Sequence, residues 1–96
     1  MRGGWVYIMT NRRDGVLCTG VTANLARRAC EHREGLIHGF TSRYGLRSLV
    51  LTEFYQDIRD AIQRERNIKH WPRAWKVRLI HAANPDWRDL SKDLNG

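Results

Sequence analysis

The chain has 96 residues and a mass of 11.3 kDa, the size of one small domain, and this length leaves no room for a second fold. Hydrophobic residues make up 42% and charged residues 28%, a balance that excludes a disordered chain and a membrane protein. Lys and Arg number 17 and Asp and Glu number 10, so the net charge is +7. This excess favours a polyanionic partner, most often nucleic acid, although a basic surface without a binding role stays open. We expect residues 1–96 to form a single domain.

The apolar runs are far shorter than a bilayer span, and residues 1–13 lack the long apolar region of a secretory signal. We therefore expect a cytoplasmic protein without membrane contact. Cys18 and Cys30 match no zinc-binding spacing, and a reducing compartment disfavours a disulfide, so we expect neither a thiolate metal site nor a cross-link.

A β-hairpin is predicted at the start of the chain. Residues 5–9 are aromatic and β-branched and indicate a strand, with Val6 and Ile8 on one face and Trp5, Tyr7 and Met9 on the other. The turn NRRDG follows, and the second strand covers residues 16–21. Gly20 within it indicates a place where another group approaches the backbone closely.

A helix is predicted over residues 25–34, with Thr22 or Asn24 as its cap. Arg28 and His32 are four residues apart, so their side chains project from the same side of this helix. A loop over residues 36–45 then leads to a third strand at residues 48–55. Strand alternation would place four of its side chains on one face, namely Leu49, Leu51, Glu53 and Tyr55.

The next helix begins at Asp57, which can cap it, with Asp60 three residues later as a variant capping box. Four apolar residues form its stripe, namely Ile58, Ala61, Ile62 and Ile68. Glu65 falls on this stripe. A carboxylate on a core-facing stripe is costly unless a cation, a metal ion or hydrogen-bond donors meet it.

Pro72 ends that helix, and a further helix over residues 73–83 is expected to turn Trp75, Leu79 and Ile80 inward. Pro85 is placed at the first position of a short closing helical turn. The order ββαβαα predicts the α+β class, with a small three-stranded, mainly antiparallel sheet flanked by three or more helices.

Four polar residues on these predicted elements stand out, namely Tyr7, Arg28, His32 and Glu65. Each has a purely structural interpretation; Glu65, for example, could pair with Arg64 or Lys69. In combination, however, a phenol, a guanidinium, an imidazole and a metal-binding carboxylate are the groups needed to hydrolyse a phosphodiester.

At this point the sequence resembles the GIY-YIG nuclease domain family. WVY at residues 5–7 stands where that family has Gly-Ile-Tyr, and CTG at residues 18–20 stands where it has Tyr-Ile-Gly. NLARRACEH at residues 24–32 and AIQRERNIKHW at residues 61–71 are similar to the segments that hold the family's arginine, histidine and glutamate. The resemblance covers residues 4–90 and extends to a short bacterial single-domain branch, similar to the nuclease part of the excision-repair protein UvrC.

The resemblance implies an endonuclease that cleaves DNA with one divalent cation, Mg²⁺ or Mn²⁺, and suggests a connection to DNA repair. Glu65 would hold the cation, and Arg28 would stabilise charge on the phosphoryl oxygens. Tyr7 would orient or deprotonate the attacking water, with His32 as a donor or proton relay. Sequence-specific cutting is not expected from so short a chain, so the substrate is expected to be branched or single-stranded DNA, with a protein partner supplying specificity.

Two positions depart from the family pattern. Cys18 replaces the second motif tyrosine, and Val77 stands where many members have a late asparagine. A Cys18 thiolate could replace the phenol as a base, but a soft thiolate is a poor match for a hard magnesium site. The alternative function is therefore a catalytically weak or inactive nucleic-acid-binding module with the same fold.

Other basic residues could line the path of the phosphates. They are Arg12, Arg13, Arg27, Arg33, Arg43, Arg47, Lys69, Arg73 and Lys76. Trp71 or Tyr44 could stack an unpaired base. The competing interpretation is that Trp71 and Trp75, four residues apart, share a hydrophobic face in the core.

Overall fold

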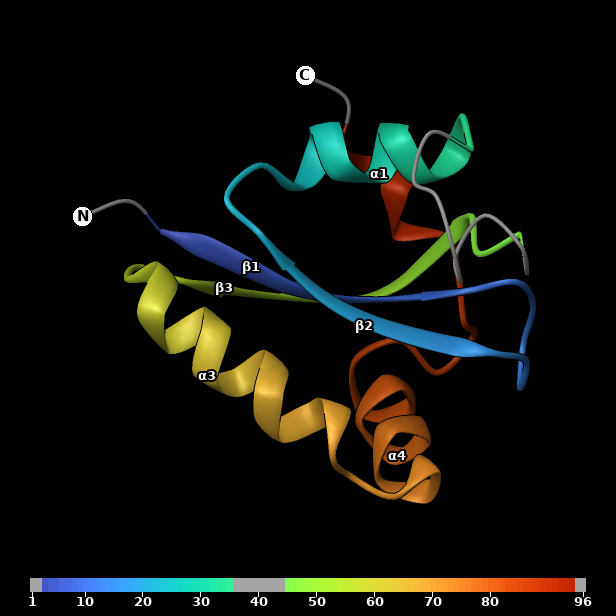
Figure 1. Cartoon of the computed structure of the whole chain (residues 1–96). Coiled ribbons are helices and arrows are strands. Elements are labelled where there is room, and N and C mark those ends of the chain that lie inside the picture. The colour runs from blue at the N-terminus through green and yellow to red at the C-terminus, as the bar shows by residue number, and fades with distance from the viewer. Residues whose placement is uncertain (1–2, 36–44, 95–96) are drawn as a thin grey trace.

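The computed structural model describes residues 3–35 and 45–94 and contains a three-stranded sheet (Figure 1). Its strands are β1 (Gly4–Thr10), β2 (Leu17–Thr22) and β3 (Ser48–Tyr55), arranged in the order β2-β1-β3. Both pairings of β1 are antiparallel. The predicted α+β class and antiparallel sheet are confirmed.

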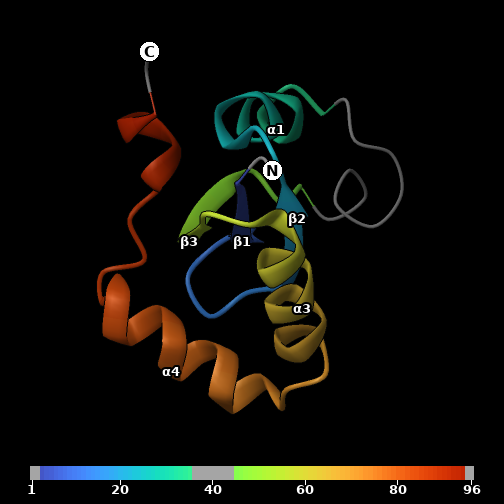
Figure 2. The same cartoon turned by 90° about the vertical axis from the view of Figure 1, so that its left-hand side faces the viewer.

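Helices cover both faces of this sheet. Helix α1 (Leu25–Arg33) and the 3-10 helix η1 (Leu90–Asp93) lie on one face, and α3 (Ile58–Lys69) and α4 (Arg73–Ala83) lie on the other (Figures 1 and 2). Within residues 3–35 and 45–94, no helix has both the length and the apolar character needed to cross a bilayer.

The side chains of β1 pack into two separate hydrophobic cores, one on each face of the sheet. Val6 and Ile8 are fully buried in the core on the side of α3 and α4. Tyr7 and Met9 are buried in the core on the side of α1. The alternation predicted for this strand is therefore confirmed, and it points Tyr7 at α1.

Strand β3 carries a bulge that the sequence pattern does not predict. Ile8 pairs with Leu51 and the next residue, Met9, pairs with Leu49, so Val50 is an extra residue in the ladder. Leu49 consequently packs on the α1 side and Leu51 on the α3 side, and the expectation that they share a face is wrong. The carbonyl oxygen of Val50 accepts a hydrogen bond of 3.1 Å from the buried Asn84 side chain, which keeps this group paired.

The starts of the two central helices follow the predicted caps. Asn24, rather than Thr22, accepts from the backbone N–H of Arg27 at 3.0 Å. Asp57 accepts from the backbone N–H of Arg59 at 2.9 Å. These caps fix where α1 and α3 begin, and therefore which side chains each helix turns toward the sheet.

Two expectations for the C-terminal part are wrong. Trp75 on α4 is 49% exposed, because Ile80, the residue buried under this helix, lies five positions later and about 140° around the axis. Pro85 lies in a turn closed by the N–H of Trp87 and the carbonyl of Asn84 at 3.0 Å, and the short helix η1 starts only at Leu90.

Candidate active site

Tyr7, Arg28 and His32 meet under α1. Nη1 of Arg28 donates to the Tyr7 hydroxyl at 3.1 Å, and Nε2 of His32 lies 3.3 Å from the same oxygen. The phenol and imidazole rings are edge-on, with centroids 5.7 Å apart. Because residues four apart lie on the same side of a helix, Arg28 and His32 both reach the hydroxyl oxygen of Tyr7 on β1.

Gly20 makes room for the Tyr7 ring. The two residues face each other across the β1–β2 pair, and a Cβ at Gly20 would overlap the hydroxyl and Cζ of Tyr7. The predicted close approach at Gly20 is confirmed. The ring thus lies flat against β2 and extends its hydroxyl to α1.

Burial sets the protonation of this cluster. It raises the pKa of Tyr7, and the hydrogen bond and positive charge of Arg28 reduce this effect without cancelling it. Burial also lowers the pKa of His32 below its ordinary value of 6.5, and Arg28 lowers it further. At pH 7 the cluster therefore consists of a phenol and a neutral imidazole beside one guanidinium.

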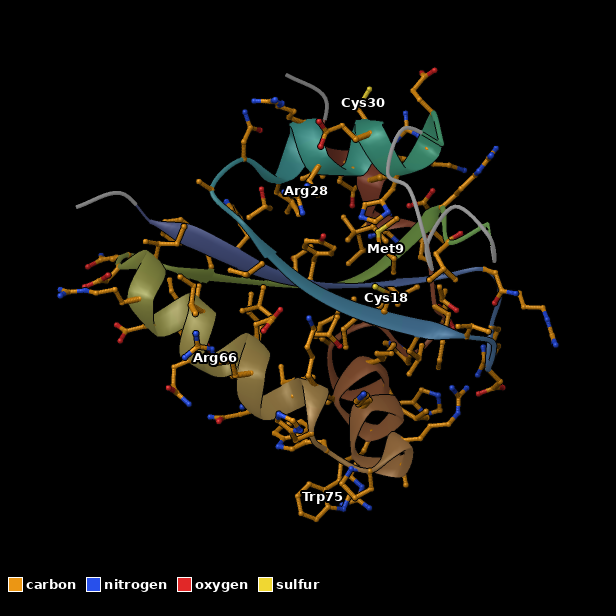
Figure 3. All side chains as sticks on the ribbon, in the orientation of Figure 1. Met9, Cys18, Arg28, Cys30, Arg66 and Trp75 are labelled. Carbon is orange, nitrogen blue, oxygen red and sulfur yellow. The ribbon has the colours of Figure 1, made fainter. Side chains whose placement is uncertain are left out.

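Cys18 lies two residues before Gly20 on β2, so the two residues face the same side of the sheet (Figure 3). This is the α1 side, where Cys18 packs against the cluster that contains Tyr7 and Met9. Burial raises the pKa of its thiol and the charge of Glu65 raises it further, whereas Lys69 and Lys76 lower it. The net direction is upward, which leaves a thiol rather than a thiolate at pH 7. The idea that Cys18 acts as a thiolate base is not supported.

Glu65 lies on α3, across the sheet from α1, and its charge acts on the thiol of Cys18. It is 9% exposed, as its place on the apolar stripe predicts, and its Oε2 lies 3.0 Å from Nζ of Lys69. Arg64, the other partner left open, instead binds Glu53 at 2.9 and 3.2 Å. The cost of burying the Glu65 carboxylate is therefore offset by the lysine one turn later.

The donor set at Glu65 decides what cation it could hold. Among residues 3–35 and 45–94, no three His, Cys, Asp or Glu side chains are grouped to hold a metal ion. Glu65 by itself offers a hard oxygen ligand, which fits Mg²⁺ because that ion keeps several waters and takes phosphate oxygens from a substrate. The sulfur of Cys18 is a soft ligand and a poor match for so hard an ion.

Glu31 is a residue that the sequence reasoning missed. It pairs with Nε of Arg28 at 3.3 Å and with Nε of Arg27 at 3.5 Å. Its spacing of three and four residues from these arginines on one helix was the available signal. Glu31 holds one edge of the Arg28 guanidinium while Nη1 binds Tyr7.

A cleft of about 410 Å³ opens beside Arg28. Its walls come from α1 and from the connection between β2 and α1, and Ile58 and Ile62 of α3 form its apolar side. The guanidinium of Arg28 therefore borders both the buried Tyr7 hydroxyl and a space open to a ligand.

Several basic residues predicted to bind phosphates instead tie the fold together. Arg33 donates to Oγ of Ser91 at 2.8 Å and joins α1 to η1. Arg73 donates to the carbonyl oxygens of Asp14 and Gly15 at 2.9 and 2.6 Å and joins α4 to the hairpin turn. These bonds use part of each guanidinium, so both arginines have a structural role.

Other predicted phosphate contacts lie on the surface. Arg12 and Arg13 are exposed in the β1–β2 turn, and Arg27 is exposed on α1. Lys76 reaches the carbonyl oxygen of Lys69 at 3.4 Å. The expectations for Arg43 and Tyr44 fall on residues 36–44 and lie outside the described residues.

Comparison with known proteins matches residues 3–78 to the model of the GIY-YIG catalytic domain. The chain belongs to the GIY-YIG family. The matched residues include all of the cluster around Tyr7, namely Tyr7 and Gly20 from β1 and β2 and Arg28 and His32 from α1.

Members of the UPF0213 group are similar to this GIY-YIG protein over most or nearly all of its length. UPF0213 protein CPE1444 of Clostridium perfringens is 34% identical over 91 residues, which cover 95% of this chain and 97% of the relative. UPF0213 protein NP_0776A of Natronomonas pharaonis is 38% identical over 76 residues, covering 79% and 88%. The solution NMR structure of UPF0213 protein BH0048 of Bacillus halodurans matches with a TM-score of 0.58 at 26% identity, covering 98% and 99%.

Proposed function

We propose that this GIY-YIG protein is an endonuclease that hydrolyses phosphodiester bonds in DNA with a divalent cation at Glu65. The observation that carries the proposal is the Tyr7 hydroxyl, which accepts from Arg28 and contacts His32 in a buried cluster. A phenol held between a fixed cation and a neutral imidazole is poised to exchange a proton, which a structural tyrosine does not require.

The hydrogen bonds around Tyr7 indicate which way its hydroxyl proton can move. Arg28 can only donate, so the Tyr7 oxygen accepts that bond and its own proton remains available. Neutral His32 carries one ring proton, and when that proton is on Nδ1 its Nε2 can take the Tyr7 proton while the Tyr7 oxygen takes a proton from the attacking water. The Tyr7 hydroxyl is thereby restored and the positive charge ends on His32, while the hydrogen bond from Arg28 keeps the Tyr7 oxygen in place.

Arg28 also serves the phosphate. Its side chain is 36% exposed and borders the open cleft, so the part of the guanidinium that does not bind Tyr7 can bond phosphoryl oxygens. Glu65 would hold Mg²⁺ or Mn²⁺, which supplies a Lewis acid for the phosphate and for the leaving oxygen. Lys69 would then move from the Glu65 carboxylate toward the substrate.

A second function is favoured by a specific pair of observations. The thiol of Cys18 stands where the resemblance places a phenol, and Lys69 already neutralises Glu65. Both features suit a nucleic-acid-binding module with weak or no catalysis. The two functions share the DNA partner and differ in turnover.

The proposed substrate is branched or single-stranded DNA, recognised by shape rather than by sequence. The basic hairpin turn with Arg12 and Arg13 and the basic face of α1 can follow a phosphate backbone but offer no obvious reading element for base edges. A protein partner would then supply the choice of target.

Cleavage of labelled single-stranded, duplex and branched DNA, with Mg²⁺ or Mn²⁺ and with chelator, tests this proposal. Glu65→Gln should lower the rate on the order of 1,000-fold, and Arg28→Lys about 100-fold. Glu34→Gln and Arg88→Lys make the same changes at exposed positions outside the site and should keep the wild-type rate. Binding without cleavage by the wild-type protein would establish the module instead, and cleavage undiminished in the site variants would mean a different nuclease.

A further inference from the structure

Trp75 forms an exposed aromatic surface on α4 that the proposed hydrolysis does not use. Its ring is 49% exposed and lies edge-on to Trp71, with ring centroids 5.9 Å apart and planes at 70°. Figure 3 shows it pointing away from the body of the molecule, on the far side of the sheet from Arg28. The core packing considered for both tryptophans therefore does not account for Trp75.

A groove of about 300 Å³ lies along this pair of rings. Arg78 and Leu79 follow Trp75 by three and four residues, so they share its side of α4, and Ala82 continues the groove by one more turn. The groove thus joins two aromatic rings to a guanidinium. We call Trp71, Trp75 and Arg78 the tryptophan platform.

Trp71 is the fixed part of the platform. It packs against the core, and the guanidinium of Arg64 lies 5.0 Å from its ring centroid. Arg64 is itself held by two hydrogen bonds to Glu53. The platform is therefore supported from below by a cation–π contact and an ion pair, which lets Trp75 offer an ordered ring face to a ligand.

The charge around the platform selects its occupant. Residues 69–83, which include the platform, hold four Lys and Arg residues and two His residues and contain no Asp or Glu. A second copy of the chain would bring these like charges together, which is costly. An anionic ligand with flat rings suits this surface, and a single-stranded nucleic acid supplies both, because its phosphates are charged and its unpaired bases can stack.

The platform is also connected to the active site. Lys76, next to Trp75 in sequence, reaches the carbonyl oxygen of Lys69, and Lys69 binds Glu65 at 3.0 Å. We propose that the tryptophan platform stacks an unpaired base of the DNA strand whose backbone passes Lys76 and Lys69 on its way to Glu65. The inference rests on the proposed function for the role of that strand, and it assigns the enzyme a substrate with a single-stranded segment.

Binding without cleavage tests the platform separately from the nuclease. Fluorescence anisotropy of a labelled thymidine oligonucleotide, and of a duplex of equal length, is measured in chelator so that hydrolysis cannot occur. Trp75→Ala should weaken binding of the single strand on the order of 10-fold and leave duplex affinity within about twofold, because a duplex offers no free base face. Trp75→Phe should retain most of the affinity.

Phe54→Ala is the matched control, since Phe54 is another exposed aromatic residue, 54% exposed, and packs on Trp5 at the other end of α3. It should leave single-strand affinity unchanged. Equal affinity of Trp75→Ala and wild type, or equal losses on both DNAs, would overturn the platform, as would a Trp75-dependent dimer in sedimentation. A wild-type protein that binds through Trp75 but never cleaves would refute the nuclease and leave the platform standing.

Discussion

The two sides of the candidate site are built in different ways. On the α1 side, Tyr7 and His32 are neutral, buried and joined by hydrogen bonds around one oxygen. On the α3 side, Glu65 and Lys69 form an ion pair, with Lys69 54% exposed in its side chain. The first side is fixed by packing, whereas the second is held by a charge contact that a cation or a phosphate can replace. The Tyr7 cluster is therefore held in place before a substrate binds, whereas Glu65 can exchange its partner when a cation or a phosphate arrives.

Gly20→Ala should lower both stability and cleavage, because it disturbs the packed side. The added Cβ would overlap the Tyr7 hydroxyl, so we expect a loss of about 1–3 kcal/mol in the free energy of unfolding and a fall in cleavage on the order of 100-fold. Urea denaturation and cleavage rates measure the two effects. The stability cost should largely disappear when Gly20→Ala is combined with Tyr7→Ala, and an unchanged cost in that background would show that Tyr7 is not what Gly20 accommodates.

Cys18→Tyr should sharpen the contrast by adding to the α1 side, where Cys18 packs beside the cluster of Tyr7 and Met9. It returns the phenol that the resemblance places at this position, and so adds a hydroxyl where the partly buried thiol now lies. We expect the cleavage rate to rise about 10-fold. Cys30→Tyr, the same change at the exposed cysteine of α1, is the control and should leave the rate unchanged. An unchanged or lower rate in a folded Cys18→Tyr protein would mean that Cys18 is not what limits turnover.

The smallest effect concerns pH and stability. Because burial lowers the pKa of His32 below 6.5, the unfolded chain binds a proton that the folded protein does not. The free energy of unfolding should therefore be fully retained above pH 6.5 and should fall as the pH drops through 6.5 toward the lower pKa of the folded protein. Urea denaturation at pH 5 and pH 7 should show this decline in wild type and in the control His70→Gln, which changes an exposed histidine. The decline should be reduced in His32→Gln, and an equal decline there would contradict the assignment.

Local chemistry was enough to predict much of this molecule from its sequence. The bounds of β3 and α4, the caps at Asn24 and Asp57, and the meeting of Arg28 with His32 all depend on neighbours within one or two turns. The close approach at Gly20 was also visible, because a glycine inside a strand has few other uses.

The failures arose where distant parts of the chain decide the outcome. The bulge at Val50 depends on pairing with β1 and on Asn84, which is 34 residues away. The choice of Lys69 over Arg64 as the partner of Glu65 was decided by Glu53, which occupies Arg64 from β3. The exposure of Trp75 depends on how α4 rotates onto the sheet. That residues 1–96 form a single domain stays a prediction.

The measurement closest to the central claim is the Mg²⁺-dependent cleavage rate of Tyr7→Phe. This change removes one hydroxyl and therefore both of its contacts, to Arg28 and to His32, while the ring still fills the space above Gly20. The account predicts a loss of about 100-fold or more, with DNA affinity and the urea midpoint close to wild type. A Tyr7→Phe protein that cleaves at the wild-type rate would contradict it.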